Sequence, residues 1–89
     1  MGPFEWDAEK RRTNLTKHGV DLSLITGFDW DAAFTRADTR GNYGEERFVS
    51  LGRIGDRLFD AVWIERGGFC RLISLRKANA REVNLYDKS

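Results

Sequence analysis

Residues 46–75 read ERFVSLGRIGDRLFDAVWIERGGFCRLISL, and this stretch decides the fold. It contains three runs rich in β-branched and aromatic residues, at 46–52, 57–65 and 69–75. Glycine-containing segments, RIGD at 53–56 and RGG at 66–68, separate the runs and favour tight turns. The stretch therefore predicts three consecutive antiparallel strands joined by two hairpins.

The segments on either side complete an α+β domain. Residues 8–18 follow Asp7, a good N-cap, and precede Gly19, which favours the left-handed conformation that ends a helix. Asp21 is expected to begin a short second helix that ends near Gly27. The other predicted elements are strands at 4–6 and 32–35, a loop at 36–44, and a helix at 78–86 with Asn79 as a candidate N-cap.

The predicted order is β-α-α-β-β-β-β-α within a single domain spanning residues 1–89. An antiparallel sheet buries one apolar face most simply by packing helices against it. We therefore expect a small antiparallel β-sheet with two N-terminal helices and one C-terminal helix.

Charge is distributed unevenly along the chain. The formal net charge is +1, yet residues 1–46 are acidic on balance and residues 47–89 are basic. The run from Arg66 to Arg81 carries five arginines or lysines and no acid. Such a run is typical of a phosphate-binding surface, but basic residues also protect the exposed edges of sheets. The run alone leaves both interpretations open.

Strand alternation divides this basic run between two faces. One predicted set is Cys70, Leu72, Ser74 and Arg76, and the other is Phe69, Arg71, Ile73 and Leu75. We expect the second set to pack beneath the helices, which leaves Ser74 and Arg76 together on the open face. A hydroxyl and a guanidinium two residues apart can bind one phosphate, whereas the alternative is that Ser74 merely fills a solvent-facing position.

The sequence offers few groups for proton transfer. His18 is the single histidine, and its unperturbed pKa near neutrality suits a general acid or base. The alternative for His18 is a favourable interaction with the C-terminal end of its helix. Glu45 and Glu46 could orient an arginine or accept a proton, or they could form ordinary surface salt bridges.

Several classes of site and location are disfavoured. Cys70 is the single cysteine, so no intramolecular disulfide forms, and one cysteine with one histidine predicts no metal site. No apolar run has the length of a membrane span, and the N-terminus lacks a signal peptide, so we expect a soluble cytoplasmic protein. Trp6, Trp30 and Trp63 are expected in the core, with base stacking as the alternative.

Short motifs occur along nearly the whole chain. They are FEWD at 4–7, Lys10, Asn14, KHGV at 17–20, GEERF at 44–48, ERG at 65–67, RLISLRKA at 71–78, Arg81, Glu82 and Tyr86. In this order and spacing they resemble the BrnT toxins, a branch of the RelE/ParE-like toxin superfamily. Residues 21–43 depart from the sequence that is usual in the family.

The resemblance implies a RelE-like fold and a toxin of a type II toxin–antitoxin module. Such a toxin cleaves mRNA as an endoribonuclease, using the 2′-hydroxyl of the substrate as nucleophile and no metal or other cofactor, and thereby inhibits translation and growth. The implied partner is a cognate BrnA-like ribbon-helix-helix antitoxin, which forms a hetero-oligomer with the toxin and binds operator DNA.

The resemblance also directs the choice of site residues. The catalytic candidates are His18 or Glu46 for proton transfer, with His18 the first choice, Arg66 and Arg76 for charge stabilisation, and Ser74 for positioning. The candidates for RNA backbone binding are Lys17, Arg71 and Lys77. The competing hypotheses are a non-catalytic nucleic-acid-binding module, a ParE-like module that targets gyrase, and a degenerate toxin that serves only in a complex.

Overall fold

The structure is a computed structural model that describes residues 3–41 and 44–89, so positions 42–43 of the predicted loop lie outside it. The elements in order are β1 (Phe4–Glu5), α1 (Ala8–His18), the 3₁₀-helix η1 (Leu22–Gly27), β2 (Phe34–Ala37), β3 (Phe48–Ile54), β4 (Arg57–Arg66), β5 (Phe69–Lys77) and α2 (Ala80–Asp87). This order confirms the predicted α+β class, with a 3₁₀-helix as the second helix.

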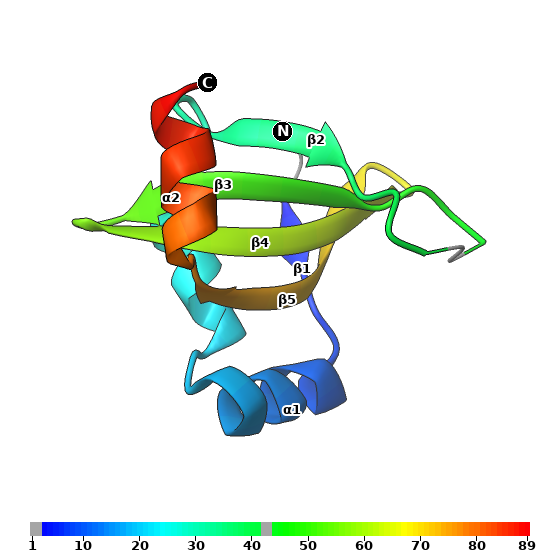
Figure 1. Cartoon of the computed structure of the whole chain (residues 1–89). Helices are drawn as coiled ribbons and strands as arrows, with labels where there is room; N and C mark the ends of the chain where they lie inside the picture. The colour runs from blue at the N-terminus through cyan, green and yellow to red at the C-terminus, as the bar shows by residue number, and fades with distance from the viewer. Residues whose placement is uncertain (1–2, 42–43) are drawn as a thin grey trace.

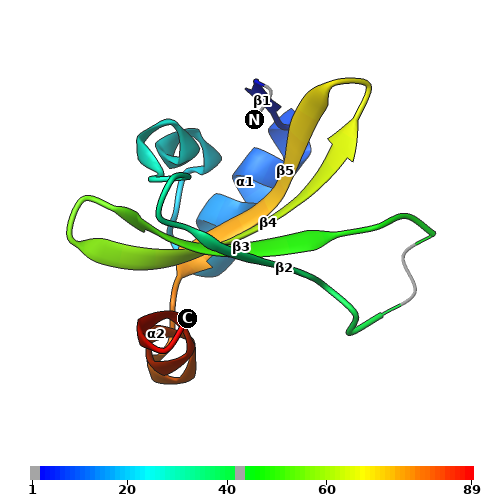
Figure 2. The same cartoon turned by 90° about the horizontal axis from the view of Figure 1, so that it is seen from above.

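The five strands form one sheet in the order β1-β5-β4-β3-β2. Strands β2 to β5 are antiparallel to their neighbours, whereas β1 pairs with β5 in parallel. The sheet is therefore mostly antiparallel, as predicted, and the parallel pairing of β1 makes it a mixed sheet. Helices η1 and α2 lie on opposite faces of the sheet, and α1 runs alongside β5 (Figures 1 and 2).

Local capping signals account for the ends of the helices. The Asp7 carboxylate accepts a hydrogen bond of 2.8 Å from the Glu9 amide, and Gly19 ends α1 with a φ of +69°. Both ends of α1 are those predicted. Helix α2 begins at Ala80, two residues later than expected, because Asn79 is its N-cap in a capping box with Glu82.

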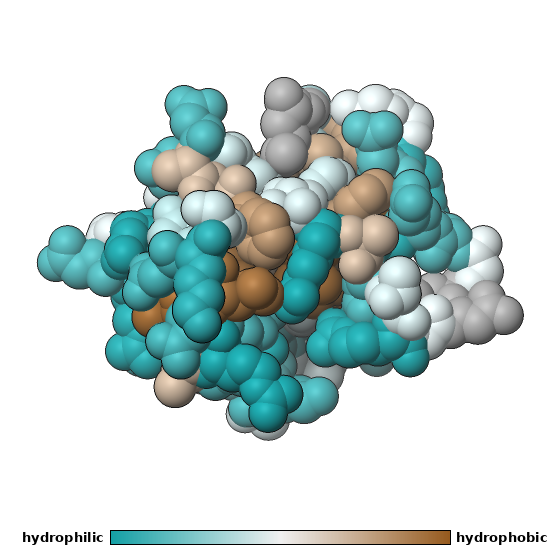
Figure 3. Space-filling model, turned by 45° about the horizontal axis from the view of Figure 1, so that its top comes forward, coloured by the Kyte–Doolittle hydropathy of each residue, from teal (hydrophilic) through white to brown (hydrophobic). Residues whose placement is uncertain are grey.

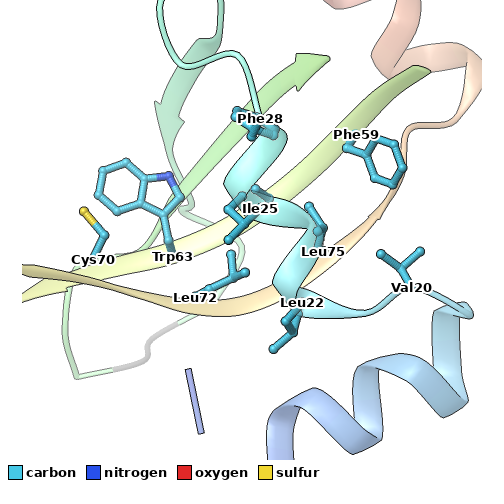
Figure 4. Packing of buried hydrophobic residues seen from close by; sticks show 10 residues of the cluster. Val20, Leu22, Ile25, Phe28, Phe59, Trp63, Cys70, Leu72 and Leu75 are labelled. Carbon is cyan, nitrogen blue, oxygen red and sulfur yellow. The ribbon is translucent and has the colours of Figure 1, made fainter. Parts of the chain in front are cut away.

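The main hydrophobic core lies between the sheet and η1. Leu22 and Ile25 of η1 are almost completely buried there, and Phe28 packs so closely that a Cβ atom on Gly52 would lie 2.5 Å from its ring. The other buried members of this core are Val20, Phe59, Ala61, Trp63, Cys70, Leu72 and Leu75 (Figure 4). Trp63 is thus a core residue, and Trp6 and Trp30 pack against the same cluster as predicted.

A β-bulge interrupts the alternation of β5. Val62 of β4 pairs with Ser74, but the next residue, Trp63, pairs with Leu72. Ile73 is therefore an extra residue on β5, and an extra residue reverses which side chains face the core. The inward-facing positions change at this point of the strand.

The bulge overturns the predicted faces of the basic run. Cys70 and Leu72 were expected on the open face, but they lie in the core with exposed fractions of 1% and 0%. Leu75, beyond the bulge, is also completely buried, whereas Phe69 is 47% exposed although it was expected beneath the helices. A strict two-residue repeat cannot anticipate an inserted residue, so the prediction was right for Leu75 but wrong for Phe69, Cys70 and Leu72.

The face of the sheet opposite η1 is called the open face below. Its middle is formed by Asp60, Val62 and Ile64 of β4, and α2 packs over Leu51 and Leu58 at one end. Among the described elements, α2 is the one that covers this face, and the end near the β4–β5 hairpin extends beyond it (Figures 1 and 2). In the space-filling view, hydrophilic residues interrupt the apolar surface in the middle of the molecule (Figure 3).

Candidate functional site

A pocket of about 390 Å³ lies between α1 and β5. Lys17 and His18 line it from the last turn of α1, and Ile73 and Ser74 line it from the bulge of β5. The bulge therefore contributes directly to the pocket. Of the residues selected from the sequence, Lys17, His18 and Ser74 are brought together here.

Asn14 holds α1 against the edge of β5. Its side-chain amide donates hydrogen bonds to the carbonyls of Val20 and Leu75 at 2.9 and 2.7 Å, and its oxygen accepts one of 3.1 Å from the Leu75 amide. The side chain thus replaces a neighbouring strand at this edge, where backbone groups would otherwise lack partners. His18 follows Asn14 by one helical turn, so this anchor also positions the imidazole beside β5.

The imidazole of His18 is placed to be neutral at physiological pH. Burial lowers its pKa below the usual value of 6.5, and the positive charges of Lys17 and Arg76 lower it further. A neutral imidazole can accept a proton. The pocket therefore combines a proton acceptor with the Ser74 hydroxyl and the Lys17 ammonium.

Arg76 lies on the open face with Ser74, as predicted, because Asp60 and Val62 opposite them are two residues apart on β4. Its guanidinium forms two hydrogen bonds of 2.8 Å with the Glu82 carboxylate and one of 3.2 Å with Asp60. These carboxylates occupy the fork that was expected to bind phosphate. Arg76 therefore acts on the pocket through its positive charge at His18 rather than through a free guanidinium.

Asp60 was not singled out from the sequence, and Glu82 was noted only as a motif residue without a role, although both determine the surroundings of Arg76. Asp60 is 3% exposed, and burial together with its hydrogen bond to Glu82 raises its pKa to about 7. Glu82 retains its charge because its hydrogen bonds with Arg76 and Asp60 outweigh burial and lower its pKa. The capping-box spacing from Asn79 to Glu82 was the signal that could have located one of the two acids.

We expect the free energy of unfolding to fall as pH rises from 5 to 8, by on the order of 1–3 kcal/mol. The folded-state pKa of Asp60, about 7, lies above its ordinary value of 3.8, so the native state binds this proton more tightly than the unfolded chain. Deprotonation then leaves a buried charge. Urea unfolding at the two pH values measures the difference.

The control for this pH dependence is Asp60→Asn, which removes the titrating group. Its stability should lack the fall toward pH 8. His18 has the opposite effect, because its lowered pKa makes the native state less stable as pH falls, but it is common to both proteins. Equal slopes for wild type and Asp60→Asn would contradict the assignment.

Other selected residues do not line the pocket. Arg66 ends β4 and forms an exposed salt bridge of 3.1 Å with Glu45. This pair is the surface salt bridge considered for Glu45. Arg71 lies 3.6 Å from the Glu5 carboxylate, across the parallel pair of β1 and β5. Both arginines project from the open face near the β4–β5 hairpin.

Glu46 and Lys77 belong neither to the pocket nor to the pair of arginines near the β4–β5 hairpin. Glu46 is exposed before β3, and β4 and β5 lie between β3 and α1. Lys77 is exposed at the end of β5, opposite Phe59, which belongs to the core face. In residues 3–41 and 44–89 no group of three or more His, Cys, Asp or Glu is arranged to hold a metal ion.

The fold is similar to that of a solved ribonuclease toxin. The 1.1 Å crystal structure of the Brucella abortus ribonuclease toxin BrnT matches with a TM-score of 0.70 at 24% sequence identity, over 89% of this chain and 99% of that chain. A family model described as the ribonuclease toxin BrnT of type II toxin–antitoxin systems matches residues 6–82. No curated protein matches.

The fold and the family match together define a ribonuclease toxin of a type II toxin–antitoxin system. The chain belongs to the BrnT family. A toxin of this class has a cognate antitoxin as its partner. None of the helices in the described part of the chain is long and apolar enough to cross a membrane.

Proposed function

We propose that this chain is a metal-independent endoribonuclease that cleaves mRNA at the pocket between α1 and β5. The observation that carries the proposal is the convergence of His18, Lys17 and Ser74 on that pocket. Cleavage of mRNA would inhibit translation and growth. A BrnA-like ribbon-helix-helix antitoxin would neutralise the toxin in a hetero-oligomer and link the complex to operator DNA.

In the proposed reaction the 2′-hydroxyl of the substrate attacks the adjacent phosphorus. His18 accepts the hydroxyl proton, the oxygen–phosphorus bond forms, and the bond to the 5′ oxygen breaks. The leaving oxygen takes a proton from solvent, and the products are a 2′,3′-cyclic phosphate and a 5′-hydroxyl end. Ser74 donates to a phosphoryl oxygen and Lys17 stabilises its negative charge. Arg76, which is paired with Glu82 and Asp60, helps to keep His18 neutral.

The remaining selected residues have supporting roles in this proposal. Arg66 and Arg71 bind the RNA backbone along the open face, and their exposed carboxylate partners can exchange with phosphates because such surface pairs are weak. Lys77 adds positive charge at the end of β5. His18 is preferred to Glu46 for proton transfer because β4 and β5 separate the strand after Glu46 from the pocket.

The test is incubation of the purified protein with labelled RNA in excess EDTA. We expect cleavage to persist and to leave 2′,3′-cyclic phosphate ends, since side chains alone supply the chemistry. Replacement of the reactive ribose by 2′-deoxyribose should stop cleavage at that position. Ser74→Ala should slow cleavage roughly 10-fold or more, as expected when one hydrogen-bond donor to the transition state is lost.

The matched control is Arg57→Gln, which removes an exposed charge at the β3–β4 hairpin, remote in sequence from the proposed site. It should cleave like wild type. Loss of wild-type cleavage in EDTA that returns with an added divalent metal would overturn the metal-independent reaction. RNA binding without any cleavage, with or without ribosomes, would support the non-catalytic alternative.

A further inference from the structure

Phe69 is a large aromatic side chain that the core does not use. It is 47% exposed, and the other exposed large apolar residues among those that the structure describes are the aliphatic Leu15, Leu24 and Val83. Those three belong to α1, η1 and α2, whereas Phe69 begins β5. A half-exposed ring contributes less to folding than a buried one, and about half of its surface is open to a ligand.

The neighbours of Phe69 on the same face are two arginines. Arg66 lies directly opposite Phe69 on β4, and Arg71 is two residues further along β5. Their carboxylate partners, Glu45 and Glu5, are themselves 41% and 42% exposed in their side chains. Ion pairs at such exposure contribute little, so a phosphate can replace either carboxylate as the partner of its arginine.

The position of Phe69 is fixed by the tight hairpin before it and by the packed sheet beside it. Gly67 and Gly68 adopt φ values of +59° and +84°, which close the hairpin immediately before Phe69. Ile64, opposite Arg71, is 2% exposed, so the sheet beneath the arginine is packed. This end of the open face extends beyond α2 (Figures 1 and 2), and the Arg66 side chain there is 56% exposed.

We propose that Phe69 is the stacking platform for one nucleobase of single-stranded RNA, with Arg66 and Arg71 binding the phosphates that flank that nucleotide. The inference rests on the proposed ribonuclease function and names a binding residue outside the pocket. Arg66 and Arg71 are diagonal neighbours on adjacent strands, roughly 7–8 Å apart, which is comparable to the spacing of successive phosphates of an extended single strand. Stacking on a ring tolerates any base, because every base has a π-face.

The positive charge around Phe69 favours RNA over a protein partner as the ligand of this surface. A protein interface usually has a contiguous apolar centre, whereas Phe69 has one arginine opposite it on β4 and another two residues further along β5. Alternating aromatic and basic side chains are typical of surfaces that bind single strands. The ring would therefore fix the register of the RNA relative to the catalytic pocket.

The test measures the binding of a short 2′-O-methyl RNA oligonucleotide, which cannot be cleaved because its 2′ oxygens are blocked. Phe69→Leu keeps an apolar side chain but removes the ring, and we expect its Kd to rise roughly 5- to 100-fold. Phe69→Tyr retains the ring and should bind within about twofold of wild type. An abasic oligonucleotide of the same length should bind wild type and Phe69→Leu equally. Thermal unfolding of each variant confirms the fold.

Two results would overturn the stacking role. The first is equal affinity of wild type and Phe69→Leu for the base-containing oligonucleotide. The second is a loss of affinity of Phe69→Leu for the abasic oligonucleotide that is as large as its loss for the base-containing one. A Phe69→Leu variant that binds RNA normally but escapes neutralisation by its antitoxin would assign the ring to the protein interface instead. Failure of wild type to cleave unmodified RNA, measured separately, would count against the proposed function alone.

Discussion

His18→Gln is expected to lower the rate of RNA cleavage by roughly 10²- to 10⁴-fold, the usual contribution of a general base. Glutamine retains a polar side chain in the pocket but cannot accept the proton of the 2′-hydroxyl. The measurement is the single-turnover rate on a labelled RNA with enzyme in excess, which separates the chemical step from product release. Retention of the wild-type thermal unfolding midpoint would show that the loss is chemical.

The pH profile provides the control for this assignment. The cleavage rate of wild type should rise with pH along an acidic limb whose midpoint lies below 6.5, because burial and the charges of Lys17 and Arg76 lower the pKa of His18. The glutamine variant should lack that limb. As the single histidine, His18 also gives one set of imidazole NMR signals whose titration reports the same ionisation directly. An acidic limb that persists in the glutamine variant would mean that a group other than His18 accepts the proton of the 2′-hydroxyl.

Asn14→Ala is expected to reduce the free energy of unfolding by about 3 kcal/mol or more. The substitution leaves two carbonyls, of Val20 and Leu75, and the Leu75 amide without their partners, and a buried unsatisfied group costs about 1–3 kcal/mol. Small domains have a total stability of only about 5–15 kcal/mol, so the loss is large. Urea unfolding measures it.

The matched control for Asn14 is Asn84→Ala, because Asn84 is an exposed asparagine in α2. Its substitution should change the free energy of unfolding by about 0.5 kcal/mol or less. A loss below about 1 kcal/mol for Asn14→Ala would mean that water replaces the side chain at the edge of β5. The anchor for α1 would then lie elsewhere.

Much of the fold could be predicted from the sequence because its signals are local. Asp7 and Gly19 set both ends of α1, and the glycines of the two hairpins separate β3, β4 and β5. Boundaries were less accurate where no such residue stands. Strand β3 begins at Phe48 rather than Glu46, and β2 spans Phe34–Ala37 instead of 32–35.

The candidate site could be predicted only in part. The motifs indicated His18 and Ser74 separately, but their meeting in one pocket depends on the packing of α1 against β5. The partners of Arg76 could not be anticipated, since Asp60 precedes it by sixteen positions and reaches it across two paired strands. The basic run alone suggested that the side chain at position 76 would be free to bind phosphate.

The sequence by itself determined the helices, the hairpins, the order of the elements and the types of group available for chemistry. Caps and turns involve residues within a few positions of one another, so their physics is contained in short segments. Only the tertiary structure decided the bulge at Ile73, the anchoring of β5 by Asn14, and the neutralisation of Arg76 by carboxylates. The Asn14 anchor joins a helix to a strand 61 positions away in the chain, a contact that exists only when the core between them has formed.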